Sequence, residues 1–164
     1  MNEILVPNAR LYAYRRQLGI SETLGSGKDG IVMVGKLKAQ PAKVAIKVLR
    51  WTEPYQREKN VYERLRDVAL GTILGFNVPQ LIDFDDELRV LEMTIVERPF
   101  VLDFAGAYLD SRPQFSEEIW ADWERDKREQ FEARWPKAQA VMDAFEELGI
   151  YLLDVTPNNI AFID

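Results

Sequence analysis

Short runs of alternating hydrophobic and polar residues fill much of the first half of the chain, which is typical of β-strands. Two of these runs are rich in valine and isoleucine, which favour strands, and a turn-forming segment with Pro41 separates them. The pattern predicts strands at 20–24, 31–37, 43–49, 80–84 and 89–96. The first three are expected to pair as antiparallel neighbours.

A helical spacing of hydrophobic residues predicts two helices in the same half, at 8–18 and 54–68. In the first of these helices, Arg15 and Arg16 are expected to lie on the exposed side. The segment 71–79 is predicted to be a loop between the second helix and the next strand.

The helix at 54–68 places a carboxylate on its buried side. Val61, Tyr62 and Leu65 follow Glu58 at the spacing of one helix face. Burying a carboxylate is costly unless the group is paired. The spacing therefore predicts a cation next to Glu58.

The second half of the chain is predicted to be mainly helical. Ser116 is a good N-cap, and a helix is expected from there to about residue 134. Pro136 either breaks this helix or starts the next one, and Gly149 suits the position after a helix end. Residues 150–153 are then expected to form a short buried strand that leads to Asp154.

Three glycines, Gly25, Gly27 and Gly30, form a GxGxxG pattern between the first two predicted strands. In a dinucleotide-binding unit the third glycine opens a helix. Here it opens the β-branched run 31–34, which favours a strand. The other common phosphate loop, GxxxxGK[ST], is excluded because its first glycine and its hydroxyl residue are both missing.

Four elements follow one another in an order that is similar to a known family. The glycine pattern and Lys47 of Val44-Ala45-Ile46-Lys47 resemble the glycine-rich loop and strand lysine of protein kinases. Glu58 resembles the helix glutamate that pairs with this lysine, and the segment from Asp154 to Asn159 resembles the catalytic loop HRDLKPxN. The chain is identified as a member of the protein-kinase-like superfamily, with the resemblance covering about residues 20–162.

The resemblance implies an α+β, protein-kinase-like fold in a single domain, 1–164. Residues 1–96 would form an N-lobe with a five-stranded antiparallel sheet and one helix. Residues 97–164 would form the hinge and a reduced helical C-lobe.

The same resemblance implies that the chain binds ATP and Mg²⁺. The glycines would take positive φ and let the backbone approach the phosphates, although an ordinary tight hairpin is the alternative. Ala45 would leave room for a flat ring beside Lys47, and the backbone at 96–99 would bond the adenine edge. The nucleotide-binding residues expected on this basis are Gly25, Ser26, Gly27, Gly30, Val32, Ala45, Lys47, Ile95 and Glu97.

For catalysis the resemblance implies roles for Lys47 and Glu58 as a pair, and for Asp154 as the group that orients and deprotonates an acceptor hydroxyl. Asn159 would hold Mg²⁺. Asp164 is either a second metal ligand or an ordinary terminal residue. A simple polar turn is the alternative interpretation of the segment from Asp154 to Asn159.

The sequence also departs from the family pattern. Leu152 and Leu153 stand where the family has His and Arg, and Thr156 replaces the catalytic-loop lysine. A DFG motif and an activation segment do not follow Asn159. Three functions are compatible with these features: a minimal phosphotransferase acting on a Ser/Thr or small-molecule hydroxyl, a nucleotide-binding pseudokinase that serves as a regulatory interaction module, and a kinase-like interaction domain without a ligand.

The composition of the chain limits its possible metal ligands, cellular location and partners. The chain has no cysteine and no histidine, so disulfides and imidazole ligands are excluded, and a reducing cytoplasmic location is the expectation. No stretch of the sequence is predicted to be a signal peptide or a membrane span.

Residues 97–164 carry seven basic and 15 acidic side chains, a net charge of −8, which argues against nucleic-acid binding. This half could attract a basic protein partner, or its acidic helices could simply be solvated.

Overall fold

The computed structural model describes residues 4–163 of the chain, which is α+β. It divides into two compact units. The first consists of Met1–Ala69 and Pro79–Ile95, and the second of Leu70–Val78 and Val96–Asp164. The sequence predicts an uninterrupted first part, 1–96, whereas 70–78 cluster with the second unit.

The first unit contains the five-stranded antiparallel sheet that the sequence predicts. Its strand order is β1-β2-β3-β7-β6, and every neighbouring pair is antiparallel. The third predicted strand has the predicted bounds, and the others differ by one or two residues at their ends. The strands are β1 (Leu18–Ser26), β2 (Gly30–Leu37), β3 (Lys43–Leu49), β6 (Leu81–Asp85) and β7 (Val90–Thr94).

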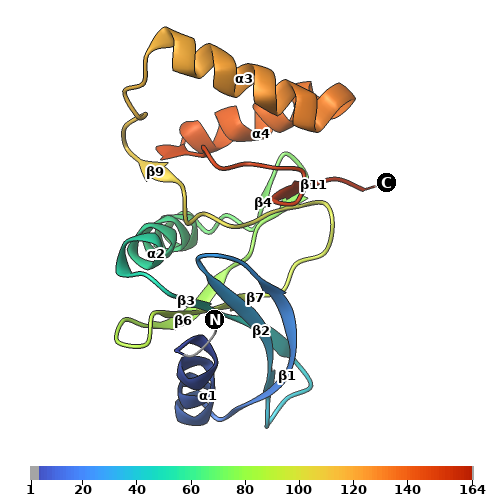
Figure 1. Cartoon of the computed structure of the whole chain (residues 1–164). Helices are drawn as coiled ribbons and strands as arrows, with labels where there is room; N and C mark the ends of the chain where they lie inside the picture. The colour runs from blue at the N-terminus through green and yellow to red at the C-terminus, as the bar shows by residue number, and fades with distance from the viewer. Residues whose placement is uncertain (1–3, 164) are drawn as a thin grey trace. The chain divides into compact units, whose positions relative to one another are not determined.

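One helix covers each face of this sheet, α1 (Leu5–Arg16) on one side and α2 (Thr52–Asp67) on the other (Figure 1). Alternate residues of β3 face opposite sides, as the pleat of a strand requires. Val44, Ile46 and Val48 belong to the hydrophobic cluster that contains the buried side of α1. Lys47 points to the α2 side, where it meets Glu58.

Two expectations about α1 are wrong. The predicted sheet has a single covering helix, whereas α1 packs on it as a second one. Arg15 is exposed as predicted, but Arg16 is half-buried, because its guanidinium binds the fully buried Glu92 of β7, with Nε–Oε1 at 2.9 Å. The Tyr12 hydroxyl donates to the same Glu92 carboxylate at 2.7 Å. Burial and this carboxylate raise the pKa of Tyr12 above its usual range, so the hydroxyl keeps its proton and remains a donor.

The second unit contains two small sheets. A four-stranded sheet has the order β11-β8-β5-β4, and β9 pairs with β10. The loop predicted at 71–79 is therefore wrong, because two very short strands form a hairpin there around Leu74 and Gly75, both with positive φ. The strands are β4 (Thr72–Ile73), β5 (Phe76–Asn77), β8 (Phe100–Val101), β9 (Tyr108–Leu109), β10 (Ile150–Tyr151) and β11 (Ile160–Ala161).

The helices of the second unit begin where the sequence predicts. Ser116 caps α3 (Glu117–Phe131) by accepting a hydrogen bond from the Ile119 N–H. A 3-10 turn, η1 (Glu132–Arg134), replaces the last predicted turn, and Pro136 starts α4 (Trp135–Glu146). Gly149 has φ 75° just after α4, as expected for a residue that ends a helix.

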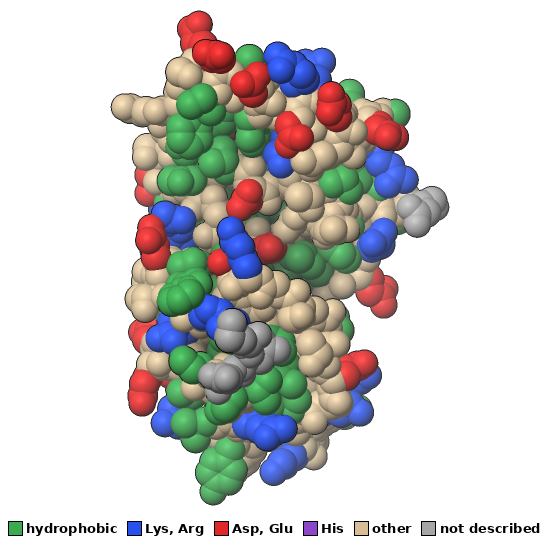
Figure 2. Space-filling model, viewed as in Figure 1, with side chains coloured by type: hydrophobic (Ala, Val, Ile, Leu, Met, Phe, Trp, Pro, Cys, Tyr) green, Lys and Arg blue, Asp and Glu red, His purple; other side chains and the backbone are tan. Residues whose placement is uncertain are grey.

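Charged side chains of both signs are interspersed over α3 and α4 in the upper part of Figure 2. Several form pairs along α3, such as Arg128 with Glu124 at 2.8 Å and Arg125 with Asp122 at 3.0 Å. Among the described residues, no helix is long and apolar enough to cross a membrane.

The Glu92 cluster leads to a prediction about stability. Replacing Tyr12 with Phe removes a hydrogen bond to a buried carboxylate, and we expect the free energy of unfolding to fall by about 2 kcal/mol. Tyr14, two residues away on the same helix, is 82% exposed, so Tyr14→Phe should change it by less than about 0.5 kcal/mol. Urea denaturation of both variants measures the difference. Equal effects would contradict the role assigned to Glu92.

Candidate functional site

Three of the predicted nucleotide-binding residues lie in one row across the sheet of the first unit. Gly25 pairs with Val32 and Val32 pairs with Lys47. Leu91 of β7 continues the row as the next partner of Lys47. Because directly paired residues share a face of an antiparallel sheet, Val32, Lys47 and Leu91 lie side by side on the α2 face.

Lys47 and Glu58 form the predicted ion pair. Lys47 Nζ lies 2.8 Å from Glu58 Oε1, within hydrogen-bond distance. The Glu58 side chain is fully buried, and the Lys47 side chain is 13% exposed. Glu58 is on the same buried stripe of α2 as Val61, Tyr62 and Leu65, so the reasoning that gave it a cationic partner is confirmed. The pair holds a positive charge in a fixed position on this face of the sheet.

Ala45 lies two residues before Lys47 and therefore on the same face of β3. It is buried and pairs with Val34 of β2 and Met93 of β7. Of these three side chains the smallest is thus the one next to the lysine, as the sequence predicts.

The glycine turn has a conformation that differs from the prediction. None of Gly25, Gly27 and Gly30 has a positive φ, so the prediction of left-handed backbone is wrong. The turn is closed by a hydrogen bond from the Gly27 N–H to the Gly30 carbonyl at 2.9 Å. The Asp29 carbonyl also accepts from the Arg50 N–H at 2.8 Å, which ties the turn to the end of β3.

The three glycines differ in what surrounds them. A Cβ at Gly30 would lie 2.2 Å from the Val48 carbonyl oxygen, so close packing against β3 requires glycine there. A Cβ at Gly25 or at Gly27 would have nothing within 4 Å. Ser26, between them, is exposed. The packing of the fold therefore explains Gly30, whereas Gly25 and Gly27 leave their backbone open to an incoming group.

The residues predicted to contact adenine follow β7. Ile95 is 42% exposed directly after the strand. The Glu97 carbonyl accepts a hydrogen bond from Asn77 Nδ2 at 2.9 Å, within the second unit. One lone pair of that carbonyl is thus already used by a side chain of the chain itself.

Asp154 and Asn159 lie in the segment between β10 and β11 in the second unit. Asp154 is exposed and packs against Gly106, where a Cβ would lie 3.1 Å from Asp154 Oδ2. The Thr156 hydroxyl donates to Asn159 Oδ1 at 2.6 Å, and the Asn159 N–H donates to the Thr156 carbonyl at 2.9 Å. This is the polar turn of the alternative interpretation, and it also fixes the amide of Asn159.

Asp103 is a residue that the sequence analysis missed. Its Oδ2 accepts from Asn159 Nδ2 at 3.2 Å, and its backbone has φ 72°, which is rare for a residue other than glycine. The two residues are 56 positions apart, and no local pattern connects them. A carboxylate and an amide oxygen are ligand types that Mg²⁺ prefers. Asn159 turns its Nδ2 to Asp103 and its Oδ1 to Thr156, so its amide oxygen keeps one lone pair for an ion.

The described residues contain no group of three or more Asp, Glu, His or Cys side chains that could hold a metal by themselves. Asp164, the second metal ligand expected from the resemblance, lies outside the described residues. A magnesium ion at Asn159 would therefore need oxygens from the phosphates or from water, as Mg²⁺ sites commonly have.

Comparison with known proteins finds no family model that matches the chain and no curated protein of significantly similar sequence.

The different surroundings of the glycines can be tested. Gly30→Ala forces a carbon into the Val48 carbonyl, and we expect it to lower the free energy of unfolding by about 2 kcal/mol. Gly27→Val meets open space, and we expect a change below about 0.5 kcal/mol. Urea denaturation compares the two. A large loss of stability in Gly27→Val would mean that this glycine also serves the fold.

Proposed function

We propose that the chain is a protein-kinase-like protein that binds ATP with Mg²⁺ and transfers its phosphate to a hydroxyl group, on a Ser/Thr side chain or a small molecule. The observation that carries this proposal is the buried ion pair between Lys47 and Glu58, in register with Gly25. In that family a lysine on the third strand contacts the phosphates, and a glutamate on the following helix pairs with this lysine and positions it.

The first unit supplies the groups that would hold a nucleotide. Glu58 holds the Lys47 ammonium in place, where it could contact the phosphates. Gly25 and Gly27 expose backbone that a phosphate can approach without meeting a side chain. Val32 and Ala45, on the same face as Lys47, are apolar and small enough to pack against a base.

The second unit supplies the groups that the resemblance assigns to the transfer itself. Asn159, fixed by Thr156 and Asp103, would hold the ion, and Mg²⁺ when bound neutralises charge on the phosphates. Asp154 is exposed and its side chain lies close to Gly106, which leaves room for it by having no Cβ. Asp154 would accept the proton of the acceptor hydroxyl.

A nucleotide-binding pseudokinase that serves as a regulatory interaction module is the second candidate. Leu152 and Leu153, in place of the polar residues before the catalytic aspartate, favour it. The Leu152 side chain is buried and the Leu153 side chain is half-buried, so neither supplies a polar group there. Thr156 uses its hydroxyl on Asn159 and adds no positive charge near the phosphate.

Nucleotide binding is tested first, by the melting temperature with and without ATP and Mg²⁺. At a ligand concentration 100 times its Kd, binding stabilises the folded state by about 2.7 kcal/mol. The double variant Lys47→Met with Glu58→Leu removes both charges together, which is often neutral for stability, and we expect it to stay folded and to lose the ATP response. Gly27→Val should weaken the response without changing the basal melting temperature.

Lys43→Met is the matched control, because Lys43 is an exposed lysine on the same strand. It should respond to ATP as the unchanged protein does. An unchanged ATP response in the double variant would exclude the proposed phosphate site. If ATP does not raise the melting temperature of the unchanged protein with any metal ion, the remaining candidate function is an interaction domain without a ligand.

Catalysis is tested by ATP turnover. We expect Asp154→Asn to lower turnover by about 100-fold or more, the usual contribution of a positioned proton acceptor, while ATP binding stays nearly the same. Asp67→Asn, an exposed aspartate at the end of α2, should change neither quantity. ATP binding without turnover in the unchanged protein would favour the pseudokinase. Turnover that survives Asp154→Asn would contradict the role of this residue.

A further inference from the structure

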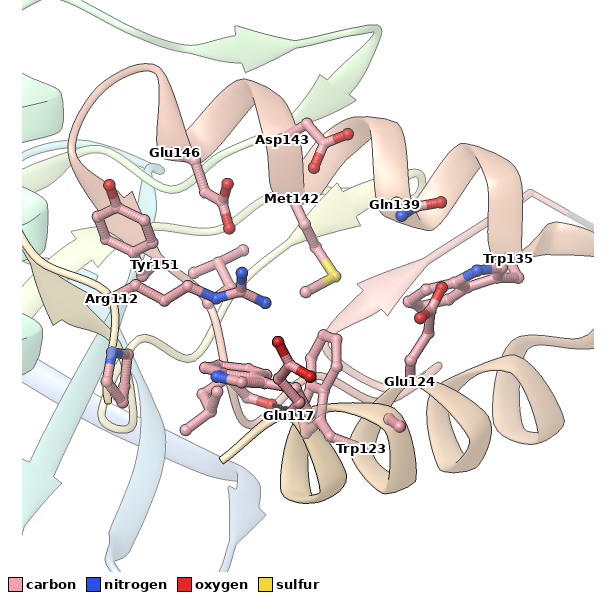
Figure 3. A pocket seen from close by; sticks show the side chains of 15 residues that line it. Arg112, Glu117, Trp123, Glu124, Trp135, Gln139, Met142, Asp143, Glu146 and Tyr151 are labelled. Atoms are coloured by element: carbon pink, nitrogen blue, oxygen red, sulfur yellow. Dashed lines mark hydrogen bonds between the residues drawn. The ribbon is translucent and has the colours of Figure 1, made fainter. Parts of the chain in front are cut away.

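The second unit contains a pocket that the proposed nucleotide chemistry does not use. It has a volume of about 540 Å³, within the usual range of ligand pockets. Figure 3 shows it between α3 below and α4 above, with the segment around Arg112 and the strand residue Tyr151 at one end. All of its lining residues belong to the second unit.

The apolar part of the lining is aromatic and fixed. Trp120, Trp123 and Trp135 follow one another in edge contacts, with ring centroids 5.7 and 6.3 Å apart. Trp123 is anchored by its hydrogen bond to the Leu153 carbonyl. Met142 of α4 points its thioether into the cavity (Figure 3). These side chains form a preformed surface for an aliphatic or flat group.

The charged part of the lining is mainly acidic. Glu117, Asp143 and Glu146 line the cavity from the two helices and are exposed, and no salt bridge within the described part of the chain neutralises them (Figure 3). A fourth carboxylate, Glu124, is paired with Arg128. Burial raises the pKa of Glu146 above its ordinary value, the positive charge of Arg112 partly offsets that effect, and the negative charge of Asp143 adds to it.

The chain itself shows what kind of group this lining accepts. The Arg112 guanidinium lies 3.8 Å from the centre of the Trp120 ring and extends between the carboxylates of the two helices (Figure 3). This is a cation–π contact of the kind that aromatic sites make with arginine and with ammonium groups. Arg112 is the one cation among the pocket-lining residues and faces three carboxylates that form no salt bridge in the described part of the chain, so the lining is negative overall.

The surface around the pocket fits a protein partner. Phe115 and Ile119, near the start of α3, are 42% and 51% exposed, and the Phe115 ring makes a tilted contact with Trp120, with centroids 5.3 Å apart. Hydrophobic side chains gather on this side of the second unit in Figure 2. A small cation would leave this apolar margin uncovered, whereas a peptide segment would cover it.

We propose that the pocket between α3 and α4 binds a lysine or arginine side chain of a basic segment in a partner protein. The aliphatic stem of that side chain would pack on Trp123 and Met142, and its charged head would reach Asp143 and Glu146. The net charge of −8 in residues 97–164 would attract such a segment from a distance. This interaction does not depend on the proposed nucleotide site.

The test uses the full chain and a capped hexa-arginine peptide as the probe. Tryptophan fluorescence reports on the pocket directly, because three of the four tryptophans line it, and calorimetry gives the Kd and stoichiometry. We expect one peptide to bind per chain, with an affinity that falls as salt is raised. The double variant Asp143→Asn with Glu146→Gln should weaken binding by about tenfold or more.

Two further variants test the charge and the aromatic face of the pocket separately. Gln139→Lys, at an exposed position in the pocket wall, adds a competing ammonium and should also weaken binding. Arg112→Ala removes the internal cation and frees the face of Trp120, so it should strengthen binding. Circular dichroism and the melting temperature of each variant confirm that it is folded.

The matched control is the double variant Glu129→Gln with Glu132→Gln, which removes the same charge from exposed positions outside the pocket. It should leave the Kd nearly unchanged. An equal loss in this control would mean general attraction to an acidic surface and would overturn the proposal. Absence of peptide binding at low salt would overturn it, and so would arginine amide binding as tightly as the peptide, which would indicate a small-molecule site.

Discussion

The fold of the first unit depends on strand β3 being covered on both faces, with one buried carboxylate held on each side. On the α2 face, Glu58 is held by Lys47, and on the α1 face, Glu92 is held by Arg16 and Tyr12. Both carboxylates are completely buried. Removing the partner of a buried charge typically costs about 3–5 kcal/mol, so these contacts fix how each helix sits on the sheet. Burial of the hydrophobic residues provides most of the free energy of folding. The two carboxylates define where α1 and α2 sit along the sheet.

The sequence revealed one of these carboxylates and not the other, for a physical reason. Glu58 falls on a helix with a clear apolar stripe, so its burial follows from local spacing. Glu92 sits in a strand, where a polar residue can equally face solvent, and its partner Arg16 is 76 residues away. The same limit explains the missed hairpin of β4 and β5, because strands of two residues are too short to produce a period.

In the candidate site, too, the sequence predicts contacts between residues near one another in the chain and misses contacts between distant residues. The spacing of Val44, Ala45 and Lys47 fixed which side chains share a face of β3, and the structure has that arrangement. Asp103 could not be found in this way, because only the chain fold brings it to Asn159. The conformation of the glycine turn could also not be predicted from the sequence, since glycine is compatible with both signs of φ.

Stability alone gives a poor account of the Lys47–Glu58 pair. Replacing a buried ion pair by hydrophobic residues of similar size is often neutral or stabilising, so a protein that needed only a folded sheet could place an apolar pair there. The glycines lead to the same conclusion. Gly30 is required by the approach of the Val48 carbonyl, whereas neither backbone conformation nor packing requires glycine at position 25 or 27. A fixed cation in the same row as open backbone is what a phosphate group needs and what a sheet by itself does not. The proposed nucleotide site would account for Gly25 and Gly27, and it would give the Lys47–Glu58 pair a role beyond positioning α2 on the sheet.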